Sequence, residues 1–131
     1  MNKVEIISIG NEILSGKIVD TNAHYIIKQL DKINLSVTHI SAVGDNETEL
    51  ISLLKEASRR SAIVIMTGGL GPTEDDITFQ SIGKAFHLPL VKYPQAEENM
   101  IKILNRIYID ISESNLKQAY LPEGSRCVIN R

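Results

Sequence analysis

Three glycines and two adjacent aspartates lie close together in the middle of the chain, in segment 67–78. Glycine tolerates positive φ and lets another molecule approach the backbone, so a glycine turn can point several N–H groups at one anion. The turn follows an apolar, β-branched run at 62–66 and precedes a helical apolar period that starts at Phe79. In open α/β sheets ligands bind beyond the carboxyl ends of strands, and a helix N-terminus attracts phosphate. The segment therefore predicts a phosphate site with acidic residues beside it.

A purely structural interpretation of the same segment is a glycine turn before a helix that Asp75 or Asp76 caps. Two familiar nucleotide motifs are excluded. No Gly-Lys-Ser/Thr follows, so the segment is not a Walker loop, and the glycine spacing is not that of the dinucleotide-binding pattern. The phosphate site and the capped turn both stay open at this point.

Further carboxylates follow other predicted strands, namely Glu12, Asp20 and Asp45. Parallel strands place such loops at one edge of the sheet, together with Asp75 and Asp76. Carboxylates brought together repel one another unless a cation relieves them, and oxygen ligands suit Mg²⁺ or Mn²⁺. We therefore predict a metal-assisted phosphate site in which Asp76 and Asp45 hold the cation. Helix capping by Asp20 and Asp45 is the alternative.

The elements that must position these residues alternate between strands and helices. Buried strands are predicted at 4–9, 35–43 and 62–66, the last of them buried on both faces. Amphipathic helices are predicted at 23–30, from 46 to about 60, and at 79–86. This order predicts right-handed βαβ crossovers and a mostly parallel sheet covered on both faces. Towards the end of the chain we expect a connection at 88–91, a helix from about 95, a short helix at 116–120 and a short strand at 126–129.

Composition narrows the class of protein. A length of 131 residues with a hydrophobic fraction of 43% predicts one domain with a core of its own. A formal net charge of −2 argues against a general nucleic-acid binder. A single cysteine, Cys127, forms no internal disulfide and predicts a cytoplasmic location. No apolar stretch approaches the roughly 20 residues of a membrane span, so no membrane partner is expected.

Several motifs in order closely resemble the N-terminal domain of the CinA family, the competence/damage-inducible proteins. They are IGNEILSGKIVDTN at 9–22, VGDN at 43–46, TGGLGPTEDDIT at 67–78, SNLKQA at 114–119 and LPEGS at 121–125. That domain belongs to the molybdopterin-binding superfamily of MogA and MoaB. The resemblance implies a three-layer α/β/α sandwich with a mostly parallel sheet. It also implies hydrolysis of the pyrophosphate bond of ADP-ribose, or of a related nucleotide diphosphate, with Mg²⁺, Mn²⁺ or Co²⁺.

The resemblance also assigns roles to single residues. Its phosphate-cradling turn matches Thr67, Gly68, Gly69 and Gly71, with Thr73 and Thr78 in the same segment. Its first ligand-side loop matches Glu12, Asp20, Thr21 and Asn22, and its later motif contains Asn115. We expect Asp76, Asp75 and Lys117 to act in catalysis, the lysine by neutralising charge beside the phosphate.

Two further expectations follow from the family. Its members usually continue past the strand near Val128 into a Gly- and Pro-containing loop that completes the ligand site. Because this sequence ends at Arg131, we expect residues 1–131 to be a single domain truncated at its C-terminal end. Relatives in the superfamily commonly self-associate, so a homo-oligomer is expected.

Two other functions remain open. The first is a pterin-binding or adenylyl-transferring protein of molybdenum-cofactor assembly, which shares the glycine turn and Asp76. The second is a non-catalytic module for ligand binding or oligomerisation. A small nucleotide or pterin ligand is expected in either catalytic case.

Overall fold

The computed structural model describes residues 2–129, so the chain end at Arg131 lies outside the described residues. The elements follow in the order β1 (Val4–Ile9), α1 (Asn11–Leu14), α2 (Thr21–Asp31), β2 (Val37–Val43), α3 (Glu47–Arg60), β3 (Ile63–Thr67), α4 (Thr78–Phe86), β4 (Leu90–Lys92), α5 (Pro94–Arg106), α6 (Glu113–Leu116), the 3₁₀ helix η1 (Lys117–Ala119) and β5 (Tyr120–Pro122). Within residues 2–129, no helix is both long and apolar enough to cross a membrane.

A parallel three-stranded sheet in the order β2-β1-β3 forms the centre of the fold. All six residues of β1 are buried, the polar Glu5 and Ser8 among them, as the middle strand of a sheet covered on both faces requires. The expectation that 62–66 is buried on both faces is wrong. Among the described strands β3 lies at the edge of the sheet, and Ile63 there is 37% exposed. An apolar run predicts a strand, whereas its place in the sheet depends on pairing with distant residues.

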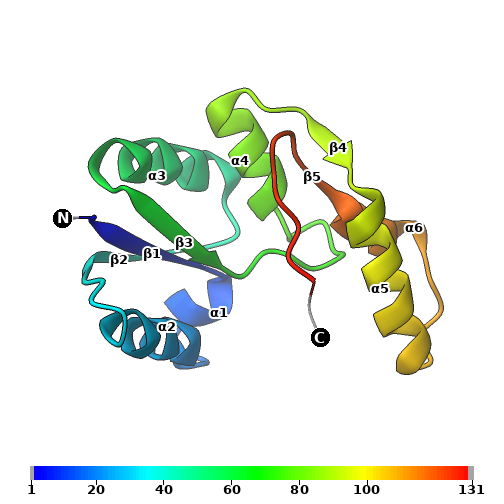
Figure 1. Cartoon of the computed structure of the whole chain (residues 1–131), viewed down its shortest axis with the longest axis horizontal. Helices are drawn as coiled ribbons and strands as arrows, with labels where there is room; N and C mark the ends of the chain where they lie inside the picture. Colours follow the sequence, from blue (N-terminus) through cyan, green and yellow to red (C-terminus); the bar gives the residue numbers. More distant parts are fainter. Residues whose placement is uncertain (1, 130–131) are drawn as a thin grey trace.

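Helices cover both faces of this sheet, which gives the predicted α/β/α layers. Figure 1 shows α3 and α4 on one side of the strands and α1 and α2 on the other. Side chains of β1 alternate between the two layers, as the period of two requires. Ile7 and Ile9 pack with Leu50 and Leu54 of α3 in the main core. The fold class predicted from the sequence is confirmed.

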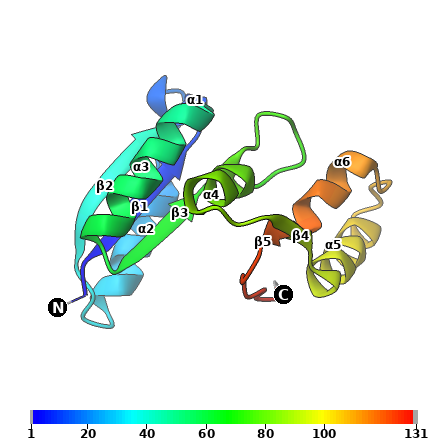
Figure 2. The same ribbon diagram turned by 90° about the horizontal axis from the view of Figure 1, so that it is seen from above.

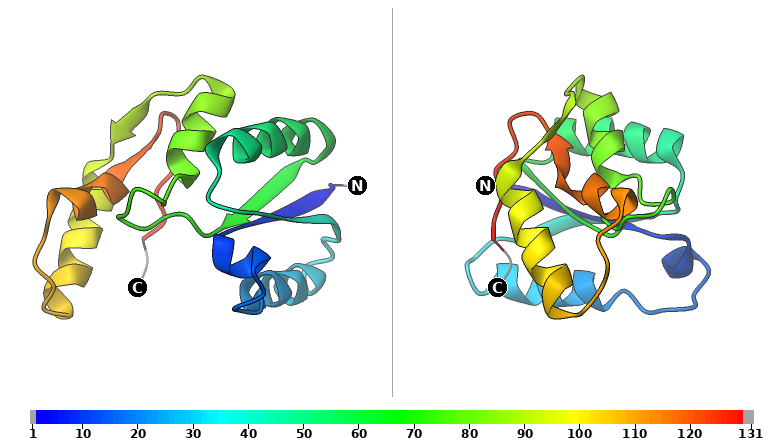
Figure 3. Two further views of the ribbon diagram at one scale, coloured as in Figure 1. Left: turned by 180° about the vertical axis from the view of Figure 1, so that it is seen from behind. Right: turned by 90° about the vertical axis from the view of Figure 1, so that its right-hand side faces the viewer.

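A smaller unit follows α4 and lies beside the sheet layers, as the views from above and behind show (Figures 2 and 3). Its strands β4 and β5 pair antiparallel, with Val91 opposite Leu121. Helix α5 was expected, and α6 with η1 confirms the short helix. The predicted strand at 126–129 is wrong, because these residues have no regular secondary structure. The real strand, β5, lies a few residues earlier and pairs with the segment predicted as a connection.

A buried ion pair closes the other end of the sheet. The Glu5 side chain on β1 is fully buried and accepts hydrogen bonds from Arg60 Nε at 3.0 Å, Arg60 Nη2 at 2.5 Å and Ser61 Oγ at 3.1 Å. The hydrogen bonds from Arg60 lower the pKa of Glu5 and outweigh the effect of its burial. Its carboxylate therefore stabilises the fold fully above the ordinary pKa of 4.5, and this stabilisation is lost as pH falls through the lower folded pKa.

We expect Glu5→Gln to lower the free energy of unfolding at pH 7 by about 2 kcal/mol, because hydrogen bonds between charged groups are lost inside the protein. Urea titration measures this, and the difference from the wild type should shrink well below pH 4.5. Glu56→Gln is the matched control, since Glu56 binds the same Arg60 at 2.6 Å but is 63% exposed. An equal loss in both variants would contradict the special role of Glu5.

Candidate functional site

The glycine turn leaves Thr67 at the end of β3 and packs against β1 and α4. Gly68 and Gly69 have φ values of 91° and 65°. A Cβ added at Gly68 would lie 2.1 Å from the carbonyl oxygen of Ile9, so only glycine lets the turn approach β1 this closely. The buried Thr78 donates from Oγ1 to the Gly68 carbonyl at 2.8 Å and from its N–H to the Gly69 carbonyl at 3.1 Å. The first residue of α4 thereby fixes the turn.

The carboxylate of Asp76 is held by the loop that follows the glycines. Thr73 donates to Asp76 Oδ2 from its N–H at 2.9 Å and from Oγ1 at 2.8 Å. Partial burial acts to raise the pKa of Asp76. The hydrogen bonds and the positive charge of Lys117 outweigh it, so the pKa lies below its ordinary value. Asp76 therefore carries its negative charge at neutral pH.

The amides of the turn were predicted to hold a phosphate. Two donors of the loop, the N–H and the hydroxyl of Thr73, already bind the Asp76 carboxylate. Within residues 2–129 the N–H groups of Gly69 and Leu70 donate to no acceptor. The loop thus combines donors that already bind an internal anion with donors that are available to an external one.

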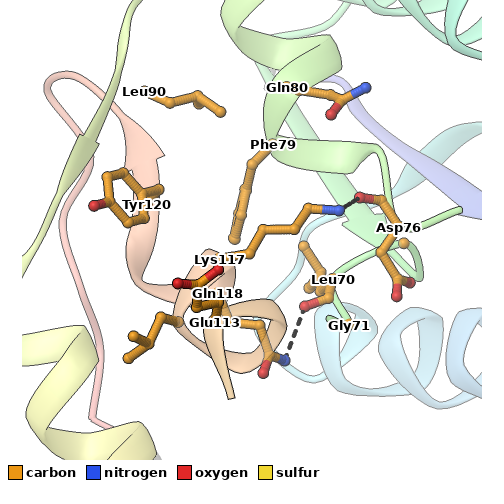
Figure 4. A pocket seen from close by; sticks show the side chains of 12 residues that line it. Leu70, Gly71, Asp76, Phe79, Gln80, Leu90, Glu113, Lys117, Gln118 and Tyr120 are labelled. Carbon is orange, nitrogen blue, oxygen red and sulfur yellow. Dashed lines mark hydrogen bonds between the residues drawn. The ribbon is translucent and has the colours of Figure 1, made fainter. Parts of the chain in front are cut away.

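Two neighbouring residues of η1 hold this loop from the other side. Lys117 Nζ donates to the carbonyl oxygens of Thr73 and Asp76, both at 2.6 Å, and Gln118 Nε2 donates to the Leu70 carbonyl at 3.1 Å. Figure 4 shows the Lys117 side chain crossing the site to reach Asp76. Lys117 therefore holds the loop by its contacts with the backbone carbonyls of Thr73 and Asp76. The positive charge of Lys117 also lowers the pKa of Asp76. The catalytic role predicted for it stays a prediction.

Four acidic residues gather at this edge of the sheet. Burial raises the pKa of Asp45, and repulsion from Glu12, Asp75 and Asp76 raises it further, against the effect of the Asn11 N–H. Within residues 2–129, however, no three His, Cys, Asp or Glu side chains lie close enough to hold one metal ion. Mg²⁺ commonly binds one or two carboxylates and completes its shell with water and phosphate. The acids fit such a hydrated ion and do not form a protein cage.

A pocket of about 470 Å³ opens beside the turn, between the parallel sheet and the smaller unit. One wall consists of residues 69–71 and Asp76, and Lys117 reaches across the pocket (Figure 4). The opposite wall is apolar and is built by α4, β4, α6 and β5 through Phe79, Leu90, Leu116 and Tyr120. The pocket can therefore take a ligand with an anionic end and an apolar end.

Three predicted ligand residues lie at the start of α2 and do not line this pocket. Asp20 caps the helix, since its carboxylate accepts from the Ala23 N–H at 3.1 Å and from the Ser8 hydroxyl. Thr21 and Asn22 are exposed in the first turn. The capping alternative for Asp20 is confirmed, and the ligand roles of all three residues stay predictions.

Helix capping also explains Asn115, which forms a capping box with Ser112 at the start of α6 and does not line the pocket. The same explanation is wrong for Asp45, because Asn46 caps α3. No side chain caps α4, whose N-cap is Ile77. The capped-turn interpretation of segment 67–78 therefore fails for both of its aspartates.

Sequence reasoning missed the apolar wall. Phe79 starts the apolar helical period predicted at 79–86, and such a period does not separate a core residue from a pocket wall. Leu90 and Tyr120 come together through β4–β5 pairing, which no local pattern indicated. Gln118 and Glu113 also line the pocket. Gln118 belongs to the SNLKQA motif at 114–119, whereas Glu113 lies just outside it.

Comparisons with known proteins agree with this fold. A family profile described as "Probable molybdopterin binding domain" matches residues 5–104. A competence-damage inducible protein of Caldanaerobacter subterraneus subsp. tengcongensis is 44% identical over 97% of this chain, and the chain spans only 31% of that relative. The crystal structure of CinA from Thermoplasma acidophilum, whose function is given as unknown, superimposes with a TM-score of 0.82 at 31% identity, covering 95% of this chain and 73% of that one.

A more distant structure is the tungsten cofactor synthesizing protein MoaB from Pyrococcus furiosus, with a TM-score of 0.61 and 27% identity over 82% of this chain and 65% of that one. The family profile covers most of the chain, and the CinA structure matches it over nearly its whole length. The chain therefore belongs to the molybdopterin-binding domain family, in its CinA branch.

Proposed function

We propose that this chain forms the ligand site of a metal-assisted nucleotide diphosphate hydrolase, with ADP-ribose or a close relative as substrate. The observation that carries the proposal is the pocket in which the glycine turn and the Asp76 carboxylate lie side by side. Burial raises the pKa of Asp45, and repulsion from Glu12, Asp75 and Asp76 raises it further, so these acids are near enough to influence one another. A bound cation would relieve that repulsion, and a diphosphate beside it would accept from the turn.

Each residue then has a distinct task. The N–H groups of Gly69 and Leu70 bind a phosphate oxygen, and the loop that Lys117 holds keeps them in place. Asp76 and Asp45 would hold the cation. When bound, a divalent cation neutralises the diphosphate and lowers the pKa of a bound water. Asp75 is exposed at the same edge and accepts the proton of the attacking water.

The reaction conserves all atoms. A water oxygen bonds to one phosphorus of the diphosphate, and the bridging P–O bond breaks with its electron pair on the departing phosphate. The proton of the attacking water is transferred to the Asp75 carboxylate. ADP-ribose thereby yields AMP and ribose 5-phosphate.

The direct test is incubation of the chain with ADP-ribose and Mg²⁺, Mn²⁺ or Co²⁺, followed by chromatography of the products. We expect AMP and ribose 5-phosphate in equal amounts, and no product when the metal is removed with EDTA. ADP-ribose that binds in calorimetry but is never cleaved would instead favour a non-catalytic binding module.

A pterin ligand is the second candidate, because the matching family is described as molybdopterin binding and MoaB shares the fold. The glycine turn and Asp76 would serve a phosphate-bearing pterin equally well. Tight binding of molybdopterin without binding of ADP-ribose would favour this function over hydrolysis.

A further inference from the structure

Helix α5 leaves its apolar side largely uncovered. The helix places Ala96, Met100, Ile103 and Leu104 on one side, at the spacing of an amphipathic helix, yet none of its 13 residues is buried. Figures 1 and 2 show α5 in the smaller unit, at the end of the molecule away from the parallel sheet. An amphipathic helix is stable when its apolar side packs against another element. Residues 2–129 cover this side of α5 only in part.

The α5 groove, a cavity of about 520 Å³, lies between this side of the helix and segment 125–128. Its walls are mostly apolar and include Met100, Ile103, Leu104 and Val128. Arg126 is the only charged residue that lines the groove, and within residues 2–129 it forms no ion pair. A cavity of this volume has room for several side chains. The groove therefore suits an occupant that is apolar and carries a negative charge.

The loop that follows α5 has this composition. Its residues 107–111 read Ile-Tyr-Ile-Asp-Ile, and all five are exposed. Tyr108 is 95% exposed and Ile107 is 56% exposed. Asp110 is the only charged residue of the loop, and within the described chain it forms no ion pair. Loop and groove are thus complementary in apolar character and in charge.

The backbone of Tyr108 supports a role for this loop. Its φ is 57°, and it directly follows Ile107, the C-cap of α5, at a position where glycine is the usual residue. A left-handed conformation is strained for any residue with a Cβ. A side chain that is almost wholly exposed gains little contact within its own chain to offset that strain. Packing of the Tyr108 ring against a partner would offset it.

We infer that loop 107–111 of one copy of this chain binds in the α5 groove of a second copy, with Asp110 against Arg126. One chain carries both the loop and the groove, so a two-fold axis forms the contact twice. Leu104 lines the groove and the loop begins three residues later, so two copies in antiparallel orientation can bring each loop to the other groove. This inference does not depend on the proposed hydrolysis, because it concerns a different surface and its test measures mass and not activity.

The test is sedimentation equilibrium of the chain over a series of protein concentrations. The mass should rise with concentration from 14.6 kDa towards twice that value. Tyr108→Gly should weaken the dimer by about 100-fold, because each dimer loses two aromatic contacts that are worth about 10-fold each. The same change relieves the backbone strain, so the urea midpoint of the monomer should not fall. A weaker dimer in this variant is then not a result of misfolding.

An exchange of charges tests the arrangement itself. Asp110→Arg and Arg126→Asp should each weaken the dimer by about 10-fold or more, because each places like charges against one another, and the double variant should restore it. Tyr25→Ala is the matched control, since Tyr25 is an exposed tyrosine of α2, outside the loop and the groove, and its loss should leave the dimer unchanged.

Three results would overturn the inference. The first is a mass of 14.6 kDa at every concentration, which would leave the groove to a different occupant. The second is self-association that Tyr108→Gly does not weaken, which would place the contact on another surface. The third is a double charge variant that dimerises no better than the single ones.

Discussion

Replacing Asp76 with asparagine is expected to lower the rate of ADP-ribose hydrolysis by about 10³-fold or more. Asparagine keeps the size of the side chain and an oxygen for the hydrogen bonds from Thr73 at 2.8 and 2.9 Å, so the loop should keep its shape. What is lost is the negative charge, which the lowered pKa of Asp76 preserves at neutral pH. Loss of a charged group that stabilises the reacting centre costs this order of rate. AMP formation under saturating ADP-ribose measures it.

Glu74→Gln is the matched control for this prediction. Glu74 lies in the same loop, is exposed and makes no hydrogen bond or ion pair within residues 2–129. Its replacement by glutamine removes one negative charge, as Asp76→Asn does, but breaks no contact. Its rate should stay within about 2-fold of the wild type. If Asp76→Asn and Glu74→Gln hydrolyse ADP-ribose equally fast, Asp76 has no role in the reaction.

Gly68→Ala is expected to destabilise the protein by about 3 kcal/mol and to abolish ligand binding at the turn. The φ of 91° is strained for alanine and costs about 1 kcal/mol. The new Cβ would also lie 2.1 Å from the Ile9 carbonyl oxygen, and backbone atoms must move to relieve this overlap. Overlap in a packed region adds about 1–3 kcal/mol. Urea titration gives the loss of stability.

Gly124→Ala separates the two contributions. Gly124 has a φ of 88°, close to that of Gly68, but a Cβ there meets no atom within 4 Å. Alanine at position 124 should therefore cost only the strain of the backbone, about 1 kcal/mol. A loss of stability as large as that of Gly68→Ala would show that strain alone, and not the contact with β1, makes glycine necessary.

The sequence predicted best those features that depend on short stretches of chain. The strand predicted at 4–9 matches β1 at both ends, because four aliphatic residues, three of them β-branched isoleucines, fall in six positions that Gly10 ends. The strand at 126–129 failed because its apolar residues pattern like a strand but have no pairing partner in the described chain. Strand formation depends on that partner, and short apolar runs do not reveal it.

The candidate site was predicted in part for the same reason. The glycine turn and Asp76 lie within a few residues of one another, so their chemistry is visible in one segment. The contacts of Lys117 with the Thr73 and Asp76 carbonyls join residues more than 40 positions apart, and the apolar wall combines four elements. No spacing rule covers contacts of that kind, and they required coordinates.

The hydrogen bonds of the Asp76 carboxylate have a consequence for how two ligands bind. One of its partners, the Thr73 N–H, is the same kind of donor that a phosphate binds. In the proposed function the phosphate binds the Gly69 and Leu70 N–H groups. If it also took over the Thr73 N–H, it would release the Asp76 carboxylate, whose charge would then be available to a cation. Each ligand would then raise the affinity of the other by an equal factor, as thermodynamic linkage requires. Anion and cation would then bind cooperatively, because the Asp76 carboxylate competes with the phosphate for the N–H donor until a cation binds the carboxylate.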